Sequence, residues 1–138
     1  MDLEVTVTSF AEHKQSYKDK IEGQRVVSFV DDEGNQRAEL VWRVASGYTV
    51  EICEFAINRE EDRRQGWGTK LMDAGLADMR EYFENLERPH SLLKVWLLAE
   101  ERNSVARAFY KARGFEEVTI LQDFYSDGDA VMCVMEVA

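Results

Sequence analysis

The chain has 138 residues, of which 45% are hydrophobic and 32% are charged, and its formal net charge is −10. This composition indicates a folded domain over residues 1–138 and excludes a disordered polymer. The acidic balance argues against nucleic-acid binding, which needs a basic surface, and no apolar run is long enough to cross a membrane.

Alternating hydrophobic residues in the first half of the chain predict β-strands. A capping residue at Thr8 or Ser9, followed by a polar segment, predicts a short helix. A turn-forming stretch at 31–35 separates two strands and therefore indicates a hairpin. The elements expected here are a strand over 3–8, a helix over 11–22, and strands over 25–30, 37–45 and 48–57.

From Gly66 the hydrophobic period changes from two to about 3.6 residues, as in a helix. Gly75 within this segment indicates close packing of the helix on a sheet. Pro89 ends this segment, and the near-continuous apolar run that follows is typical of a strand buried on both faces. The elements expected here are helices over 66–86 and 104–113 and strands over 92–99, 115–121 and 130–137. Their order predicts a mixed α/β (α+β) sheet with helices on both faces.

The two cysteines, Cys53 and Cys133, lie in separate predicted strands, and the sequence has no Cys-x-x-Cys pair or Cys/His cluster. This arrangement argues against a zinc site and favours buried structural thiols. Residues 1–4 lack the basic start and apolar stretch of a signal peptide, so we expect a cytoplasmic protein, in which a disulfide is disfavoured. His13 and His90 lie outside both motifs described below and are expected at the surface.

The first motif is Arg-Arg-Gln-Gly-Trp-Gly-Thr-Lys over residues 63–70, between a predicted strand and a predicted helix. Glycines permit a positive φ, and the N–H groups that begin a helix attract anions. With Arg59 nearby, the motif forms a basic island that suits a pyrophosphate; a tight turn without a ligand is the alternative. A Rossmann loop is excluded because position 71 is Leu, and a Walker loop because its Gly-Lys-Ser/Thr is absent.

The second motif covers residues 103–115, with Asn103 before a predicted helix, Phe109 and Tyr110 within it, and Gly114 after it. An amphipathic helix capped by Asn103 and stopped by Gly114 accounts for most of this pattern. That reading does not explain why a tyrosine follows Phe109.

Together, in this order of elements, the two motifs resemble those of the GNAT acetyltransferase superfamily. Residues 63–68 match the family's Arg/Gln-x-x-Gly-x-Gly/Ala acetyl-CoA loop, and residues 103–115 match its Asn…Tyr…Gly-Phe motif. The match covers residues 40–138 well and the N-terminal third by topology alone. The resemblance implies a mostly antiparallel GNAT-type sheet, and transfer of an acetyl group from acetyl-CoA, as co-substrate, to a primary amine without a metal.

The resemblance also implies where acetyl-CoA binds. Backbone N–H groups of residues 64–69 would hold the pyrophosphate, and the strand around Ile57 would pair with the pantetheine arm. An N–H group there would polarise the thioester carbonyl, and Asn103 would contact the cofactor. The implied cofactor-binding residues are Ile57, Arg63, Arg64, Gln65, Gly66, Trp67, Gly68, Thr69 and Asn103.

Three residues are candidates for proton transfer. Tyr110 matches the family's tyrosine acid, whose phenol has an unperturbed pKa of about 10 and donates to the leaving thiolate. Glu51 and Glu54 are candidates for the base that deprotonates the amine. They have opposite parity and face opposite sides of the strand unless a bulge intervenes. Counting back from Ile57 ranks Glu51 first; the alternative for each is a solvent-facing strand charge.

The C-terminal stretch resembles the branch of the family that acetylates protein N-termini, including the ribosomal-protein alanine acetyltransferases. That resemblance implies that Phe124 and Tyr125 hold the amino end of a peptide; packing of an aromatic hairpin end is the alternative. The base of the ribosomal enzymes would fall at Leu98, which is a departure from their pattern. The acceptor is therefore a protein N-terminus or a small amine, and a homodimer is implied because family members are often dimers.

Two other classes of function remain open at the level of sequence. A CoA-binding module without catalysis, serving as a sensor or interaction domain, would bind acetyl-CoA but never consume it. An α/β scaffold without a ligand would not bind CoA at all.

Overall fold

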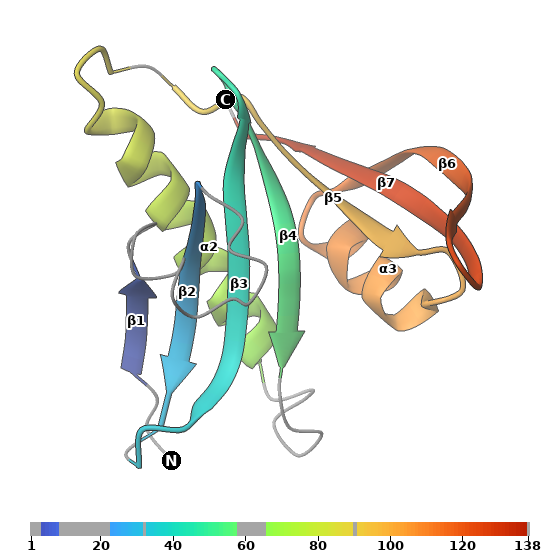
Figure 1. Ribbon diagram of the computed structural model, residues 1–138, viewed down its shortest axis with the longest axis horizontal. Coiled ribbons are helices and arrows are strands. Elements are labelled where there is room, and N and C mark those ends of the chain that lie inside the picture. Colours follow the sequence, from blue (N-terminus) through green and yellow to red (C-terminus); the bar gives the residue numbers. More distant parts are fainter. Residues whose placement is uncertain (1–3, 9–22, 32, 58–65, 90, 138) are drawn as a thin grey trace.

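The computed structural model describes residues 4–8, 23–31, 33–57, 66–89 and 91–137. In these ranges seven strands form one sheet, and two helices accompany it (Figure 1). The elements are β1 (Glu4–Thr8), β2 (Gln24–Val30), β3 (Gln36–Ser46), β4 (Thr49–Ile57), α2 (Trp67–Glu84), β5 (Lys94–Glu100), α3 (Ser104–Ala112), β6 (Glu116–Tyr125) and β7 (Gly128–Glu136).

This order of elements confirms the predicted mixed sheet. The strands lie in the order β1-β2-β3-β4-β5-β7-β6, and each neighbouring pair is antiparallel except β4 and β5. The parallel pair is joined through α2, as a crossover connection requires. The prediction was wrong about the end of β6, which continues past Leu121 to Tyr125 through a register shift.

β4 and β5 pair along only part of their length. Their register runs from Thr49 opposite Lys94 to Ile52 opposite Leu97, and no ladder pair joins the two strands beyond that point. Figure 1 shows β4 and β5 diverging from there, so that the sheet opens in its middle. The second half of β4 therefore has a strand neighbour on the β3 side only.

α2 covers the first half of the sheet and builds the main core there. Its buried Leu71, Met72, Met79 and Phe83 lie in the same cluster as the buried side chains of β3. Gly75 brings this helix close to the sheet, since a Cβ atom at that position would lie 2.6 Å from Cδ1 of Leu40. The glycine predicted to mark close packing on a sheet is thus confirmed in that role.

One carboxylate of α2 is buried against the sheet. Asp78 is 7% exposed, and its Oδ2 atom accepts hydrogen bonds from Nε1 of Trp42 at 3.0 Å and from Nε of Arg25 at 2.7 Å. Because a buried charge is stable only when it is paired and hydrogen-bonded, this triad fixes α2 on β2 and β3.

α3 packs on the same face of the sheet as α2. Arg107 of α3 forms a bidentate ion pair with Glu117 of β6: its Nε donates to Oε2 at 2.7 Å and its Nη2 donates to Oε1 at 2.9 Å. Phe109 of α3 contacts Phe55 of β4, whose ring also faces the start of α2. The helix expected over 11–22 lies outside the described residues, so the prediction of helices on both faces stays a prediction.

Two further sequence inferences concern burial and membranes. Both cysteines are free thiols; Cys133 is buried as predicted, and Cys53 is half-buried. Neither of the two described helices has the length and apolar character needed to cross a bilayer.

Candidate active site

The start of α2 has the features of an anion site. Gly66, the residue before the helix, has φ 81°, and there is open space where its Cβ would lie. It has no side chain to cap the helix, and the first turn contains no acidic residue. The N–H groups of this turn precede the first intrahelical bond, from the Lys70 amide to the Gly66 carbonyl. Such groups bind phosphates.

Trp67 and Lys70 shape the surface beside this turn. The Lys70 ammonium lies 4.9 Å from the centre of the Trp67 ring, and the ring meets Phe29 of β2 edge-on at 6.3 Å. The indole Nε1 atom is buried, and it has no hydrogen-bond partner in the described part of the chain. Arg63, Arg64 and Gln65, also predicted to bind the cofactor, lie outside the described residues.

Gly68 joins the two sequence motifs. A Cβ atom there would lie 3.2 Å from Cε1 of Phe109, so the missing side chain lets α2 approach α3 closely. Helix packing therefore favours a glycine here. The predicted contact of Gly68 with the cofactor stays a prediction. The packing contact with Phe109 places Thr69 and the rest of the first turn of α2 next to the α3 aromatic residues.

The opening between β4 and β5 borders this region. The unpaired side of β4 runs from Cys53 to Ile57, and Ile57 is the last residue before the chain leads toward the anion site. Asn103 precedes α3 at the end of β5, and its Oδ1 accepts from the Ala106 amide at 3.1 Å. This confirms the predicted cap, and Asn103 is exposed.

Tyr110 lies in an aromatic cluster on the α2 face of the sheet. Its ring centre is 6.0 Å from that of Phe55 and 5.8 Å from that of Phe115. Burial, and then the neighbouring Cys133 and Tyr125, raise the pKa of Tyr110 to about 12. The phenol therefore stays protonated throughout the ordinary pH range.

A bulge in β4 decides how the two glutamates lie. Val41 of β3 is opposite Glu54, but the next residue, Trp42, is opposite Ile52, so Cys53 is the extra residue. The bulge puts Glu51 and Glu54 on the same face, away from α2, although their numbers have opposite parity.

The two glutamates nevertheless differ in their surroundings. Glu51 lies in the stretch where β4 pairs with β5, and its Oε1 is 2.7 Å from Nε of Arg43. Glu54 is exposed and lies past the bulge, where β4 and β5 have separated. Burial, and then the charge of Glu51, raise the pKa of the Cys53 thiol between them to about 11, so this thiol is a poor nucleophile.

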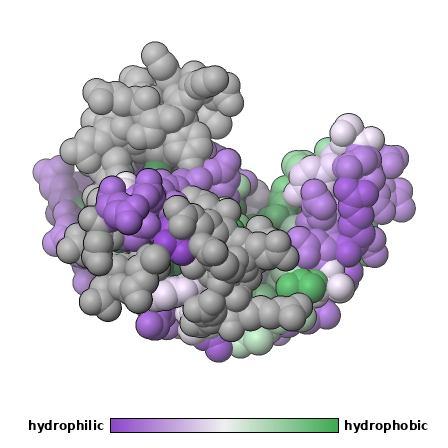
Figure 2. Space-filling model, turned by 90° about the horizontal axis from the view of Figure 1, so that it is seen from below, coloured by the Kyte–Doolittle hydropathy of each residue, from purple (hydrophilic) through white to green (hydrophobic). Residues whose placement is uncertain are grey.

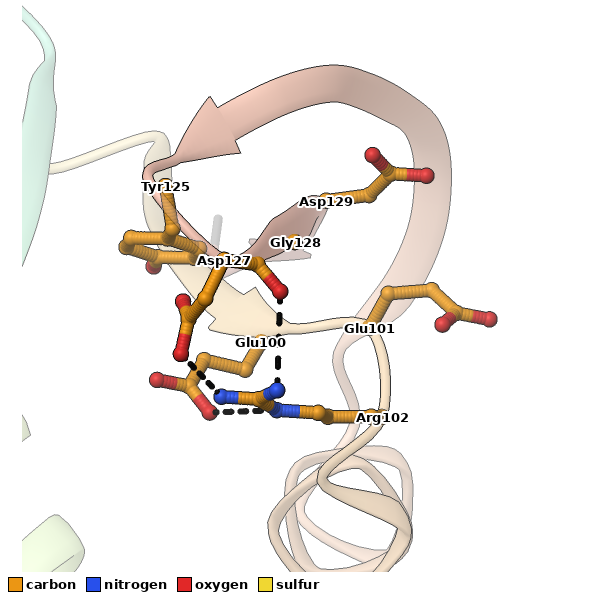
Figure 3. A pocket seen from close by; sticks show the side chains of 7 residues that line it. All are labelled: Glu100, Glu101, Arg102, Tyr125, Asp127, Gly128 and Asp129. Carbon is orange, nitrogen blue, oxygen red and sulfur yellow. Dashed lines mark hydrogen bonds and ion pairs between the residues drawn. The ribbon is translucent and has the colours of Figure 1, made fainter.

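Phe124 and Tyr125 lie at the tip of the β6–β7 hairpin. Their rings meet edge-on at 5.0 Å, and Phe124 is 53% exposed. Tyr125 lines a cavity of about 210 Å³ together with the end of β5 and the hairpin turn (Figure 3). Burial and then the charge of Glu100 raise the pKa of Tyr125.

The space-filling view shows how these parts relate. Seen from below, the molecule is hollowed between the half that carries β1–β4 and the half that carries β6 and β7, with hydrophobic residues along the hollow (Figure 2). The hollow separates β4 from the β6–β7 hairpin (Figure 2). The unpaired side of β4 therefore lies on one side of it and the hairpin tip on the other.

The family comparison agrees with this arrangement. A family model described as "Acetyltransferase (GNAT) family" matches residues 9–115, well over half of the chain. The chain belongs to the GNAT acetyltransferase family. Both motifs of this GNAT chain lie inside the match, whereas β6 and β7 lie beyond it, so the hairpin must be interpreted from its own residues.

Individual relatives point to the same class. An N-alpha-acetyltransferase of Sulfurisphaera tokodaii is 35% identical over 86 residues, which are 62% of this GNAT chain and 45% of the relative. The match thus spans less than half the length of that protein. Ard1 from Thermoplasma volcanium is 28% identical with a TM-score of 0.70, covering 95% of this chain and 81% of Ard1.

A more distant solved structure shows the fold with its ligand. A GNAT family acetyltransferase from Elizabethkingia anophelis, solved with acetyl-CoA bound, has a TM-score of 0.76 at 14% identity, covering 98% of each chain. At this identity the likeness concerns the fold alone.

Proposed function

We propose that this GNAT protein transfers an acetyl group from acetyl-CoA to a primary amine, and that the amine is the N-terminus of a protein. The observation that carries the proposal is the opening between β4 and β5, which has the uncapped start of α2 at one end and the Tyr110 cluster beside it. The curated N-alpha-acetyltransferase relative supports the choice of acceptor.

The residues present fit acetyl-CoA. The open space at Gly66 and the N–H groups that precede the first intrahelical bond of α2 suit its pyrophosphate. The unpaired side of β4 from Cys53 to Ile57 suits the amide groups of its pantetheine arm, because an extended chain adds to a strand edge by backbone hydrogen bonds. When bound, acetyl-CoA supplies an activated acetyl group. Asn103 and residues 63–65 are proposed to complete the site.

Tyr110 is proposed to assist departure of the thiolate. As the amine nitrogen bonds to the acetyl carbon and the C–S bond breaks, negative charge develops on sulfur. A phenol whose pKa is raised to about 12 is too weak an acid to give its proton fully to a thiolate of ordinary pKa. It instead stabilises the charge as a hydrogen-bond donor, and solvent then supplies the proton.

Glu54 is proposed as the general base, in place of the residue that the sequence ranked first. Glu51 lies where β4 and β5 are still paired, before the opening begins. Glu54 lies past the bulge, at the opening, and is exposed to solvent that can carry a proton away. A base is needed because the amine is mostly protonated at neutral pH.

Glu54→Gln is expected to lower kcat/KM about tenfold at pH 7, because only about one tenth of α-amino groups are uncharged there. The loss of kcat/KM should be smaller at pH 9, where most of the amine is already uncharged. Glu51→Gln makes the same change on the same face of β4 and is the matched control, with a loss of less than about twofold. A larger loss for Glu51→Gln than for Glu54→Gln would return the role to Glu51.

Phe124 and Tyr125 are proposed to hold the amino end of the acceptor. The exposed Phe124 ring and the partly buried Tyr125 ring offer a hydrophobic contact and a hydroxyl at the hairpin tip. The assignment extends the sequence resemblance to the hairpin, which lies outside the family match, and it is supported by the exposure of the Phe124 ring at the hairpin tip.

Thiol release from acetyl-CoA in the presence of a panel of amines tests the function. We expect peptides with a free N-terminus to be acetylated, and the same peptides with a blocked N-terminus to be inert. Acetylation of small amines alone would replace the peptide acceptor by a small molecule. Binding of acetyl-CoA by calorimetry without consumption by any amine would favour the inactive CoA-binding module instead.

A further inference from the structure

One arginine ties the β6–β7 turn to the end of β5. Arg102 lies between β5 and α3; its Nη2 is 2.6 Å from Oδ2 of Asp127, and its Nη1 donates to the carbonyl oxygen of Asp127 at 3.5 Å. Its Nε lies 3.6 Å from Oε2 of Glu100, the last residue of β5. Figure 3 shows the guanidinium between the two carboxylates.

The charges around this contact make the arginine necessary. Among the described residues that line the cavity, Arg102 is the single cation beside four carboxylates. The carboxylates of Glu100 and Asp127 face the guanidinium, whereas those of Glu101 and Asp129 point away from Arg102 (Figure 3). Without the guanidinium, the first two carboxylates would repel one another across the cavity.

The hairpin tip has little regular pairing of its own. The β6–β7 register shifts between Leu121 and Tyr125, and Asp123 has φ 53°. The Asp123 amide donates to Oδ1 of Asp129 at 2.8 Å. This hydrogen bond joins two residues of the hairpin tip and does not connect the tip to β5. The ladder between β5 and β7 ends with Glu100 opposite Ala130. Beyond that pair, the tip is joined to the end of β5 by Arg102 and by the backbone bond from Glu101 N to Asp129 O at 2.9 Å.

Tyr125 is part of the segment that is held in this way. It lies two residues before Asp127 and lines the same cavity as Glu100. In the close-up, Tyr125, Asp127 and Glu100 lie together at one end of the cavity (Figure 3). The position of Tyr125, which is proposed to hold the amino end of the acceptor, therefore depends on the position of the turn.

We propose that Arg102 is a positioning residue for the acceptor: it holds the β6–β7 turn against the end of β5 and so fixes Tyr125 for contact with the amino end of the acceptor. The inference rests on the proposed function of the hairpin, but the attachment itself does not. Both side chains of the Arg102–Asp127 pair are exposed, at 60% and 61%, so breaking it should change the local geometry more than the global stability.

Steady-state kinetics of Arg102→Gln test this role, with an acceptor peptide and acetyl-CoA varied separately. We expect KM for the peptide to rise about two- to fivefold, while KM for acetyl-CoA and kcat stay within about twofold. Because the pair is exposed to salt, KM for the peptide should rise with ionic strength in the wild type and less so in the variant. Arg102→Gln/Asp127→Asn should be no worse than Arg102→Gln, since the paired charges act as a unit.

Lys111→Gln is the matched control, because it removes a cation from an ion pair of α3, with Glu117 at 3.3 Å, away from the cavity. Hydrogen exchange of the amides over 122–129 reports on the attachment of the turn and does not depend on turnover. Exchange should be faster in Arg102→Gln than in the wild type, and unchanged in Lys111→Gln. Equal rises in both Michaelis constants, or unchanged exchange, would overturn the positioning role. If exchange is faster in Arg102→Gln but the wild type acetylates no amine, the role of Arg102 in holding the turn would be supported. The proposed function would then be wrong.

Discussion

Replacing Tyr110 by phenylalanine is expected to lower kcat on the order of 10²-fold, while Kd for acetyl-CoA stays within about twofold. The hydroxyl is the only group lost, and the ring keeps its contacts with Phe55, Phe109 and Phe115. The loss should therefore fall on the chemical step rather than on binding or folding. Because the pKa of Tyr110 is raised to about 12, its proton is present at every assay pH. The variant should accordingly lower the whole pH–rate profile without moving its limbs.

The measurement is kcat from pH 6 to 10, together with calorimetric binding of acetyl-CoA. Tyr48→Phe makes the same change at an exposed position in the turn between β3 and β4, and it should leave both quantities unchanged. A profile for Tyr110→Phe that keeps the wild-type height would remove this residue from the reaction. An equal loss of affinity and turnover would indicate a role in binding instead.

Asp78→Ala is expected to lower the free energy of unfolding by about 3 kcal/mol. The substitution leaves the buried indole N–H of Trp42 without its acceptor and removes the partner of the Arg25 guanidinium. The Trp42 side chain is fully buried, so water cannot replace the lost bond without opening the core. Asp78→Asn keeps an acceptor oxygen at the same place and should lose less.

Urea denaturation followed by tryptophan fluorescence measures this effect. Asp73→Ala removes a carboxylate from the exposed side of the same helix and should change the free energy of unfolding by less than about 0.5 kcal/mol. Since Ala has a higher helix propensity than Asp, propensity cannot account for a loss. If Asp73→Ala and Asp78→Ala were equally destabilising, the buried triad would not be the cause.

Local patterns in the sequence were sufficient to predict most of the fold. The alternating strands, the 3.6-residue helical period and the Asn103 cap depend on residues close together in the chain, and the described elements agree with them. Gly75 was also interpreted correctly, because a glycine on the apolar face of a helix lowers helix stability and is favourable there when close packing requires it.

The features that could not be predicted depend on residues far apart or on one extra residue. The Cys53 bulge changes which way Glu54 faces, and a single inserted position leaves no local pattern. The contact from Arg102 to Asp127 joins residues 25 positions apart. Asp78 did carry a signal, since an acidic residue three positions after Gly75 interrupts the apolar face of α2. A carboxylate at such a position indicates a buried partner on the sheet.

The separation of β4 from β5 also bears on how the protein avoids aggregation. An unpaired strand side ordinarily recruits strands of other molecules. Here it lies inside the sheet and not at its rim, and the contact between Gly68 and Phe109 brings α2 and α3 together beneath it. A strand side enclosed within one sheet is less accessible to a strand that is already part of another folded sheet. A single extended chain can still add to it by backbone hydrogen bonds.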